Sequence, residues 1–168
     1  MRCCVRARKK AGGMGIRSVW QRLSGRGAAT ELDPARTDLV VVVSSFDDAE
    51  ACSSALDRAT AWRADEQALL RHHLRIPAAA RDEVVDIAAQ DGYSPAAPSA
   101  ADAETDVPPD DAADGHIELV LQRVQILDAL HCAQERSRMA GLAQRHEGTA
   151  TGWDALQPSG YKEIASAD

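Results

Sequence analysis

The sequence predicts an α+β fold. Some stretches alternate apolar and polar residues, as a half-buried strand does, and others repeat apolar residues every three or four positions, as an amphipathic helix does. The chain has 168 residues, which is the usual size of one domain. With one Phe, two Tyr, three Trp and many alanines, its core must be built by close approach of small side chains.

Charge is distributed unevenly along the chain, whose formal net charge is −7. Residues 1–30 hold eight Arg or Lys and no acid, which leaves 11 basic and 26 acidic residues beyond them. We interpret residues 1–30 as a basic tail. Its composition fits a transit peptide, but we favour an upstream start codon that precedes the true initiator at Met14. The acidic body repels phosphates, so we expect no direct binding of nucleic acid.

The apolar runs and the cysteines of the sequence indicate the cellular compartment. The longest uninterrupted apolar run, Leu39 to Val43, is far shorter than the roughly 20 residues that cross a bilayer, so we expect no membrane span. Glycines follow the basic start where a signal peptide requires an apolar segment. Cys52 and Cys132 fall among alanines in predicted helices, where reduced thiols pack as small apolar groups, and this favours the cytoplasm.

The first predicted elements are a strand, a helix and a second strand. Residues 39–43 form a continuous run typical of a strand covered on both faces. A helix is expected over 47–61, because Asp47 and Glu50 resemble a capping box and apolar residues follow at helical spacing. Residues 69–76 alternate like a strand with one buried face. That face comprises Leu70, His72, Leu74 and Ile76, and the other comprises Leu69, Arg71, His73 and Arg75.

The remaining elements follow in the same way. Pro77 suits the first turn of a helix that Gly92 ends, and a short strand is expected near residues 93–96. Residues 95–115 are acidic and too polar to offset the entropy of ordering, so they are predicted to be a disordered loop. Further predictions are a strand at 116–122, a helix at 124–146 whose small residues lie against the sheet, a cap at Gly148, a final strand with Trp153 and Leu156, and a tail at 158–168.

This order of elements predicts a ferredoxin-like sandwich (βαββαβ) with an additional N-terminal strand-helix unit at 39–61. The whole forms one domain over residues 38–157. Periodicity also permits an α/β arrangement in which residues 39–43 begin the core repeat.

The pattern of reactive side chains predicts no catalytic residue, cofactor or metal site, and hence no enzyme. His72 and His73 are adjacent on a strand and point to opposite faces, and His131 and Cys132 point about 100° apart on a helix. Trp153 is expected to fill the core against Ala140 and Ala143. A charged, solvated outer face of the long helix is expected to hold Glu135, Arg136, Arg138, Arg145 and His146.

Two stretches resemble the ribonuclease E inhibitor family, the regulators of ribonuclease E activity B. The first runs from Arg71 to Pro77 and is followed by an Ala-rich helix and Asp91-Gly92-Tyr93. The second, residues 142–153, resembles the family's ending, a helix closing on "LA-x-x-H-x-G" and then "GW". The sequence departs from the family at Glu147, where a second Gly is usual, and at Ala150-Thr151, where a Tyr-Asp pair is usual. The matching motif residues are His73, Pro77, Gly92, His146, Gly148, Gly152 and Trp153.

The resemblance implies a ferredoxin-like domain without catalytic activity that binds a ribonuclease E-type endonuclease and restrains it. The acidic body suits a basic protein partner. An alternative is a ferredoxin-like domain for small-molecule sensing or dimerisation, and a homo-oligomer is compatible with either. The candidate partner-binding residues are the acids Asp102, Glu104, Asp106, Asp110, Asp111 and Asp114.

Overall fold

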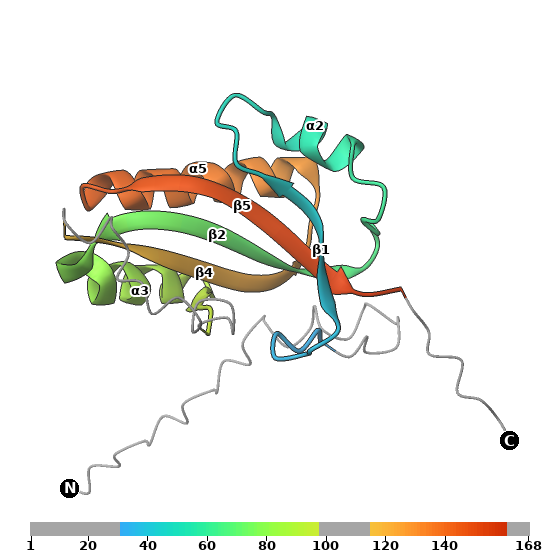
Figure 1. Cartoon of the computed structure of the whole chain (residues 1–168), viewed down its shortest axis with the longest axis horizontal. Coiled ribbons are helices and arrows are strands. Elements are labelled where there is room, and N and C mark those ends of the chain that lie inside the picture. The colour runs from blue at the N-terminus through green and yellow to red at the C-terminus, as the bar shows by residue number, and fades with distance from the viewer. Residues whose placement is uncertain (1–30, 98–114, 161–168) are drawn as a thin grey trace, which may run out of the picture. The chain divides into compact units, whose positions relative to one another are not determined.

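The computed structural model describes residues 31–97 and 115–160 (Figure 1). The predicted basic tail at 1–30, most of the predicted acidic loop and residues 161–168 lie outside the described residues. The described elements, in chain order, are β1 (Leu39–Ser45), α2 (Cys52–Asp57), β2 (Gln67–Pro77), the 3-10 turn η1 (Ala78–Ala80), α3 (Arg81–Gln90), β3 (Ser94–Pro95), β4 (His116–Ile126), α5 (Ala129–Arg145) and β5 (Thr149–Pro158).

The five strands form one antiparallel sheet in the order β1-β5-β2-β4-β3. The predicted α+β class is confirmed at this level, as a five-stranded antiparallel sheet with three helices in the described residues. None of those helices is long and apolar enough to cross a membrane.

Strand β2 lies at the centre of the sheet and determines what each face carries. Its side chains alternate as predicted: those of even-numbered residues 68–76 are buried, and Arg71, His73 and Arg75 are half-buried on the opposite face. All three helices pack on the even-numbered face. One core cluster joins Leu70 to α2 and the start of α5, and the other joins Leu74 and Ile76 to α3 and the end of α5.

Trp153 is fully buried, as expected for a ring that fills a core of small residues. Its neighbours differ from those predicted. Trp153 belongs to the cluster with Leu56 and Cys132, whereas Ala143, a predicted neighbour, belongs to the other cluster. A third, smaller cluster of Leu32, Leu69 and Leu156 lies on the face without helices.

The position of β1 differs from the prediction. The run of valines predicts a strand covered on both faces, but β1 is an edge strand that pairs with β5, and Val40 and Val41 are exposed. The helix after it is also shorter than predicted, because residues 46–51 form a loop and α2 spans Cys52–Asp57. A run of β-branched residues reports propensity for a strand and not the strand's place in the sheet.

The start of the long helix also differs from the prediction. Residues 124–126 continue the pairing of β4 with β2, and α5 begins after Asp128, whose side chain accepts a hydrogen bond from the amide of His131 at 2.8 Å. Only part of the predicted row of small residues on α5 packs against the sheet, since Ala143 is buried in the core but Ala133 and Ser137 are exposed. The buried face holds Cys132, Glu135, Met139, Leu142 and Ala143.

Candidate functional site

The two stretches that carry the family resemblance become neighbouring strands. β2 and β5 pair so that His73 lies opposite Gly152 and His72 lies opposite Trp153. Because adjacent residues of a strand face opposite sides, His72 and Trp153 are buried under the helices, while His73 lies on the other face of the sheet. The predicted separation of the two histidines is confirmed.

A buried carboxylate, Asp154, organises the sheet face without helices. Arg71 donates two hydrogen bonds to it, each 2.7 Å long, and His73 Nε2 lies 3.0 Å from its Oδ2. Burial favours the neutral acid, but the hydrogen bonds from His73 and Arg71 outweigh burial and keep the pKa of Asp154 below its ordinary value. The three side chains therefore form an ion cluster that joins β2 to β5.

Phe46 closes one side of this ion cluster and explains why a glycine stands at 152. The centre of its ring lies 5.1 Å from the centre of the His73 ring. A Cβ at Gly152 would come within 2.3 Å of the Phe46 ring and 2.8 Å of the Ser45 carbonyl oxygen. The absence of a side chain at 152 thus lets the Phe46 ring, which stays 59% exposed, approach the backbone of β5 closely.

The turn between α5 and β5 holds two more motif positions. The amide of Gly148 donates to the Ala143 carbonyl at 2.9 Å, and the amide of Glu147 donates to the Gln144 carbonyl at 3.3 Å. This pair of bonds is the Schellman arrangement, in which a left-handed residue ends a helix. The left-handed residue is Glu147, with φ of 59°, and not the predicted cap Gly148.

Gly148 has a different role. A Cβ at this position would lie 2.5 Å from the carbonyl oxygen of Arg75 and 2.6 Å from the side chain of Ile76, so glycine allows the turn to approach β2. His146, just before it, places Nδ1 3.8 Å from Glu83 of α3. Pro77 precedes the 3-10 turn that leads into α3.

Gly92 is the motif residue at the end of α3, where φ is 81° as its predicted capping role requires. It precedes Tyr93, which is buried and donates a hydrogen bond from its hydroxyl to Glu135 at 3.0 Å. Arg123 also pairs with Glu135, at 3.1 Å, and lies over the Tyr93 ring. Burial, chiefly, raises the pKa of the Tyr93 hydroxyl.

The prediction of a charged, solvated outer face on the long helix, α5, is therefore wrong in part. Glu135 is buried and holds β4 to α5, and Arg138 pairs with Asp91 at 2.6 Å. Arg136 is half-buried and binds the loop between β1 and α2. The sequence missed these roles because helical spacing shows which residues share a face and not what packs against it.

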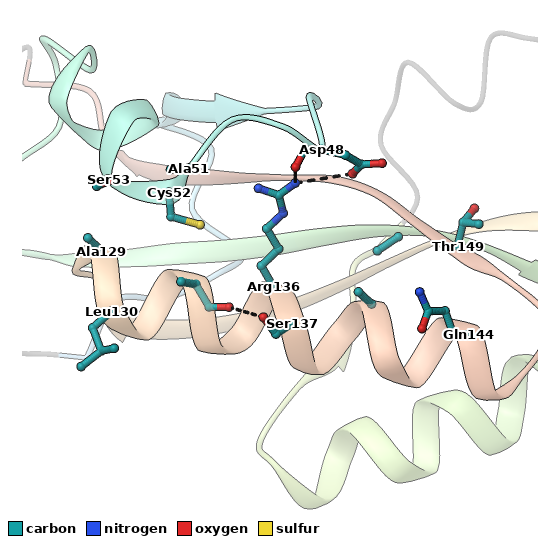
Figure 2. A pocket seen from close by; sticks show the side chains of 13 residues that line it. Asp48, Ala51, Cys52, Ser53, Ala129, Leu130, Arg136, Ser137, Gln144 and Thr149 are labelled. Carbon is teal, nitrogen blue, oxygen red and sulfur yellow. Dashed lines mark hydrogen bonds and ion pairs between the residues drawn. The ribbon is translucent and has the colours of Figure 1, made fainter.

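A groove with a volume of about 780 Å³ lies over the exposed side of α5 (Figure 2). Helix α5 contributes small side chains at Ala129, Ala133, Ser137 and Ala140. The opposite wall comes from the start of α2 and the loop before it, and the start of β5 supplies Thr149 and Ala150. The small-residue row that the sequence assigns to the sheet is thus part of the groove lining.

Arg136 holds the loop wall of this groove in place. Figure 2 shows its side chain reaching from α5 to the loop at Asp48. Its guanidinium donates to the backbone carbonyls of Asp47, Asp48 and Glu50 at 3.2, 2.8 and 2.6 Å. The same guanidinium lies 3.5 Å from the carboxylate of Asp48, whose side chain is 93% exposed at the groove rim. The groove therefore presents small apolar groups beside a rim at which Arg136 and Asp48 form an ion pair.

A second arginine, Arg58, also holds the loop between β1 and α2. Arg58 binds the Glu50 carboxylate at 2.7 and 3.0 Å and also donates to the Ser44 carbonyl. The hydrogen bond from Arg58 lowers the pKa of Glu50 to about 2. Arg136 of α5 and Arg58, which directly follows α2, thus fix the chain between β1 and α2.

The reactive groups that the sequence analysis weighed remain apart. His131 is exposed and pairs with Asp128 at 2.6 Å, while Cys132 is buried in the core. Cys52 and Cys132 are both free and buried, as expected for reduced thiols, and Cys52 also contributes to the groove wall. Within residues 31–97 and 115–160, no group of three or more His, Cys, Asp or Glu is placed to hold a metal ion.

The structure brings together His73, Gly152 and the strand that carries Trp153, and it brings Gly148 against the end of β2. The acidic candidates for partner binding all lie outside the described residues: Asp102, Glu104, Asp106, Asp110, Asp111 and Asp114. Comparison of the chain with protein-family models, with curated proteins and with solved structures finds no match.

Proposed function

We propose that this chain is a non-catalytic cytoplasmic regulator that binds and restrains a ribonuclease E-type endonuclease through protein–protein contacts. The proposal starts from the resemblance of residues 71–93 and 142–153 to the ribonuclease E inhibitor family. The geometry adds that these two stretches form one packed unit, with Gly148 against β2 and His73 opposite Gly152.

We also propose that the domain is a ferredoxin-like sandwich. The order β5-β2-β4-β3 supports this, because it is the order that a βαββαβ unit of this kind adopts when α3 and α5 cover one face. β1 and α2 then form an addition at the β5 edge. This addition supplies one wall of the groove, so it belongs to the proposed binding surface.

The observation that carries the proposed binding mode is the groove over α5. Its small side chains permit close approach of a partner backbone, and the carboxylate of Asp48 lies exposed at its rim. A segment with an apolar face and basic flanks matches this chemistry. We propose that such a basic segment of the endonuclease occupies the groove, with acids 102–114 adding electrostatic attraction.

The test uses the full chain and a purified ribonuclease E-type endonuclease. Binding is measured by calorimetry at about 50 mM and about 500 mM salt, where the Debye length falls roughly threefold. We expect binding at low salt, weaker binding at high salt, and slower cleavage of a structured RNA when the chain is present. Absence of both binding and inhibition at low salt would contradict the proposal.

A matched pair of variants locates the surface. Ala133→Arg places a cation in the groove, whereas Ala89→Arg places one on the exposed side of α3, and both alanines are exposed on helices. We expect Ala133→Arg to weaken binding at least about tenfold and Ala89→Arg to leave it unchanged. Equal effects of the two variants would show that the groove is not the contact surface.

A second candidate function is small-molecule sensing. The volume of the groove, about 780 Å³, lies in the range of ligand pockets, roughly 300 to 1,000 Å³. A thermal-shift panel of free amino acids at millimolar concentration tests this candidate, since a ligand of the native state raises the melting temperature. A shift that Ala133→Arg abolishes would favour sensing over regulation by protein contact.

A further inference from the structure

Two cysteine thiols meet where α2 packs on α5. Cys52 is the first residue of α2, and Cys132 lies in the first turn of α5. In the described part of the chain both cysteines are free, and both belong to the core cluster that holds Trp153. The two thiols lie within hydrogen-bonding reach of each other. Side chains from two different helices therefore form a dithiol pair.

The two sulfurs differ in their access to solvent. Cys132 is 0% exposed and enclosed by the core, whereas Cys52 is 5% exposed and lines the groove over α5. Figure 2 shows Cys52 at the start of α2 with its sulfur directed toward α5. α2 has only six residues, and among the described residues no side chain caps its first turn, so its first residue is held weakly. A small reagent in the groove therefore meets Cys52 before Cys132.

The surroundings of the pair also assign different reactivities to the two thiols. Burial, reinforced by the hydrogen bond with Cys52, raises the pKa of the Cys132 thiol, and the charge of Arg136 opposes this increase only in part. A thiol that stays protonated is a poor nucleophile. Cys132 is thus unreactive toward a reagent in solution but lies beside any sulfur species that forms on Cys52.

We propose that Cys52 and Cys132 form a reversible disulfide site, oxidised by a hydroperoxide that enters the groove. Cys52 is the attacking thiol, and Cys132 is the resolving thiol. A low-molecular-weight thiol reduces the disulfide again by thiol–disulfide exchange, as in redox-sensing disulfides of reducing compartments. This site goes beyond the proposed regulation of an endonuclease, since its chemistry involves neither the enzyme nor RNA.

Hydrogen peroxide is the simplest reagent of this class, and the two thiols supply the two electrons that reduce it. The Cys52 sulfur, as thiolate, attacks one peroxide oxygen, so an S–O bond forms, the O–O bond breaks, and the departing hydroxide takes up the thiol proton as water. The Cys132 sulfur then attacks the sulfenic sulfur of Cys52, which forms the S–S bond and breaks the S–O bond. The second hydroxide leaves as water with the proton of Cys132.

The disulfide would change how the groove wall is held. It would link α2 covalently to α5, two elements that line the groove. In the reduced chain, Arg136 and Arg58 hold the loop before α2 through hydrogen bonds alone. We therefore expect hydrogen exchange of the α2 amides to be slower in the oxidised chain than in the reduced chain.

The test uses the full chain with Cys3→Ser and Cys4→Ser, which removes the two thiols outside the described residues. The folded protein is treated with hydrogen peroxide, alkylated and analysed by mass spectrometry. We expect a mass loss of about 2 Da, the two hydrogen atoms lost in one disulfide, and a digest in which the peptides of Cys52 and Cys132 are joined. Dithiothreitol should restore both thiols.

Two matched variants test the role of each thiol. Cys132→Ser should stop at the sulfenic acid of Cys52, which dimedone traps, because the resolving thiol has been removed. Cys52→Ser should stay unmodified, because the core encloses Cys132. Circular dichroism checks that both variants fold.

A competition experiment with both cysteines present needs neither variant. Dimedone is added during oxidation, and the yield of disulfide is compared with the yield of dimedone adduct. Because folding holds Cys132 beside Cys52, this ratio should be at least about tenfold higher in the folded chain than in urea.

Three results overturn the proposal. They are an equal ratio in the two states, oxidation of Cys52 to sulfinic acid while Cys132 remains a thiol, and a folded chain in which both thiols resist hydrogen peroxide. None of these assays contains endonuclease, so failure of the disulfide site is distinguishable from failure of the proposed function.

Discussion

At the scale of single residues, His72 shows how burial sets the response of the fold to pH. Its side chain is 1% exposed, and its Nε2 atom has no hydrogen-bond partner. Burial, reinforced by the charges of His73 and Arg123, lowers the pKa of His72 to about 3. The folded protein therefore holds a neutral imidazole where the unfolded chain binds a proton below about pH 6.5.

This difference predicts acid sensitivity of the fold. Because the pKa of His72 is lower in the folded state, its contribution to stability is complete above the unfolded pKa and is lost as pH falls toward 3. Between pH 7 and pH 5 the free energy of unfolding should decrease by about 2 kcal/mol through this residue. Urea titrations of the wild type and of His72→Gln at both pH values measure it.

The variant is expected to be less stable at pH 7 but to lose less stability on acidification. His131→Gln is the control, since His131 is exposed on the surface of α5. An equal decrease in wild type and His72→Gln would show that His72 is protonated without cost in the folded state.

Glu147 is a second residue whose conformation has a measurable cost. Glu147 has φ of 59° in the turn that ends α5, and Gly92 has φ of 81° at the same position of the turn that ends α3. Both turns have the same pair of backbone hydrogen bonds. A residue with a Cβ is strained in this conformation. Glu147→Gly should raise the free energy of unfolding by about 0.5 to 1 kcal/mol, measured by urea denaturation.

The reverse change provides the comparison. Gly92→Ala should lower the free energy of unfolding by about 1 kcal/mol, because alanine must adopt the same left-handed conformation. If Glu147→Gly were neutral or destabilising, the Glu147 side chain would have to contribute a contact that offsets its strain.

At the scale of elements, the loop between β1 and α2 depends on the arginines that hold it. Arg136 alone satisfies three backbone carbonyls of residues 47–50. Hydrogen bonds from charged donors are the stronger ones, and carbonyls left without a donor must be rehydrated. The groove wall is thus maintained by a contact between residues separated by more than 80 positions in sequence.

Arg136→Ala should lower the free energy of unfolding by about 2 to 3 kcal/mol and speed hydrogen exchange of α2 amides. Arg136→Lys should recover only part of this, because one ammonium group cannot match the planar fork of donors. Arg145→Ala, an exposed arginine in the same helix, serves as control and should change stability by less than about 0.5 kcal/mol. Unchanged exchange of α2 in Arg136→Ala would mean that α2 packing alone fixes the loop.

The elements themselves differ in how far the sequence determines them. The alternation in β2 and β4 is strong because one face is buried and the other is not, and it predicts both strands and the opposite orientations of His72 and His73. The valine run of β1 carries no such contrast, so it does not distinguish a central strand from an edge. The sequence predicts too early a start for α5, because Val124 and Ile126 fit the spacing of a strand and of a helix equally well. The cap that Asp128 provides sets the observed start.

At the scale of the whole molecule, the order of elements along the chain is sufficient to predict the α+β class but does not predict the groove. Its walls come from α2, α5 and β5, which are far apart in sequence, and small residues such as Ala133 pack equally well against a sheet or beneath an open groove. The roles of Gly148 and Gly152 likewise depend on partners, Ile76 and Phe46, that local sequence cannot reveal.

The pairing of β1 with β5 has a consequence for biosynthesis. β1 is the first strand of the described domain to be made and β5 is the last, and their register joins Leu39 to Pro158. At typical translation rates of about 5 to 20 residues per second, the valine-rich segment waits roughly 6 to 24 s before its partner strand exists. During that interval it is an unpaired, uncharged β-segment on a nascent chain, the kind of sequence that chaperones must shield.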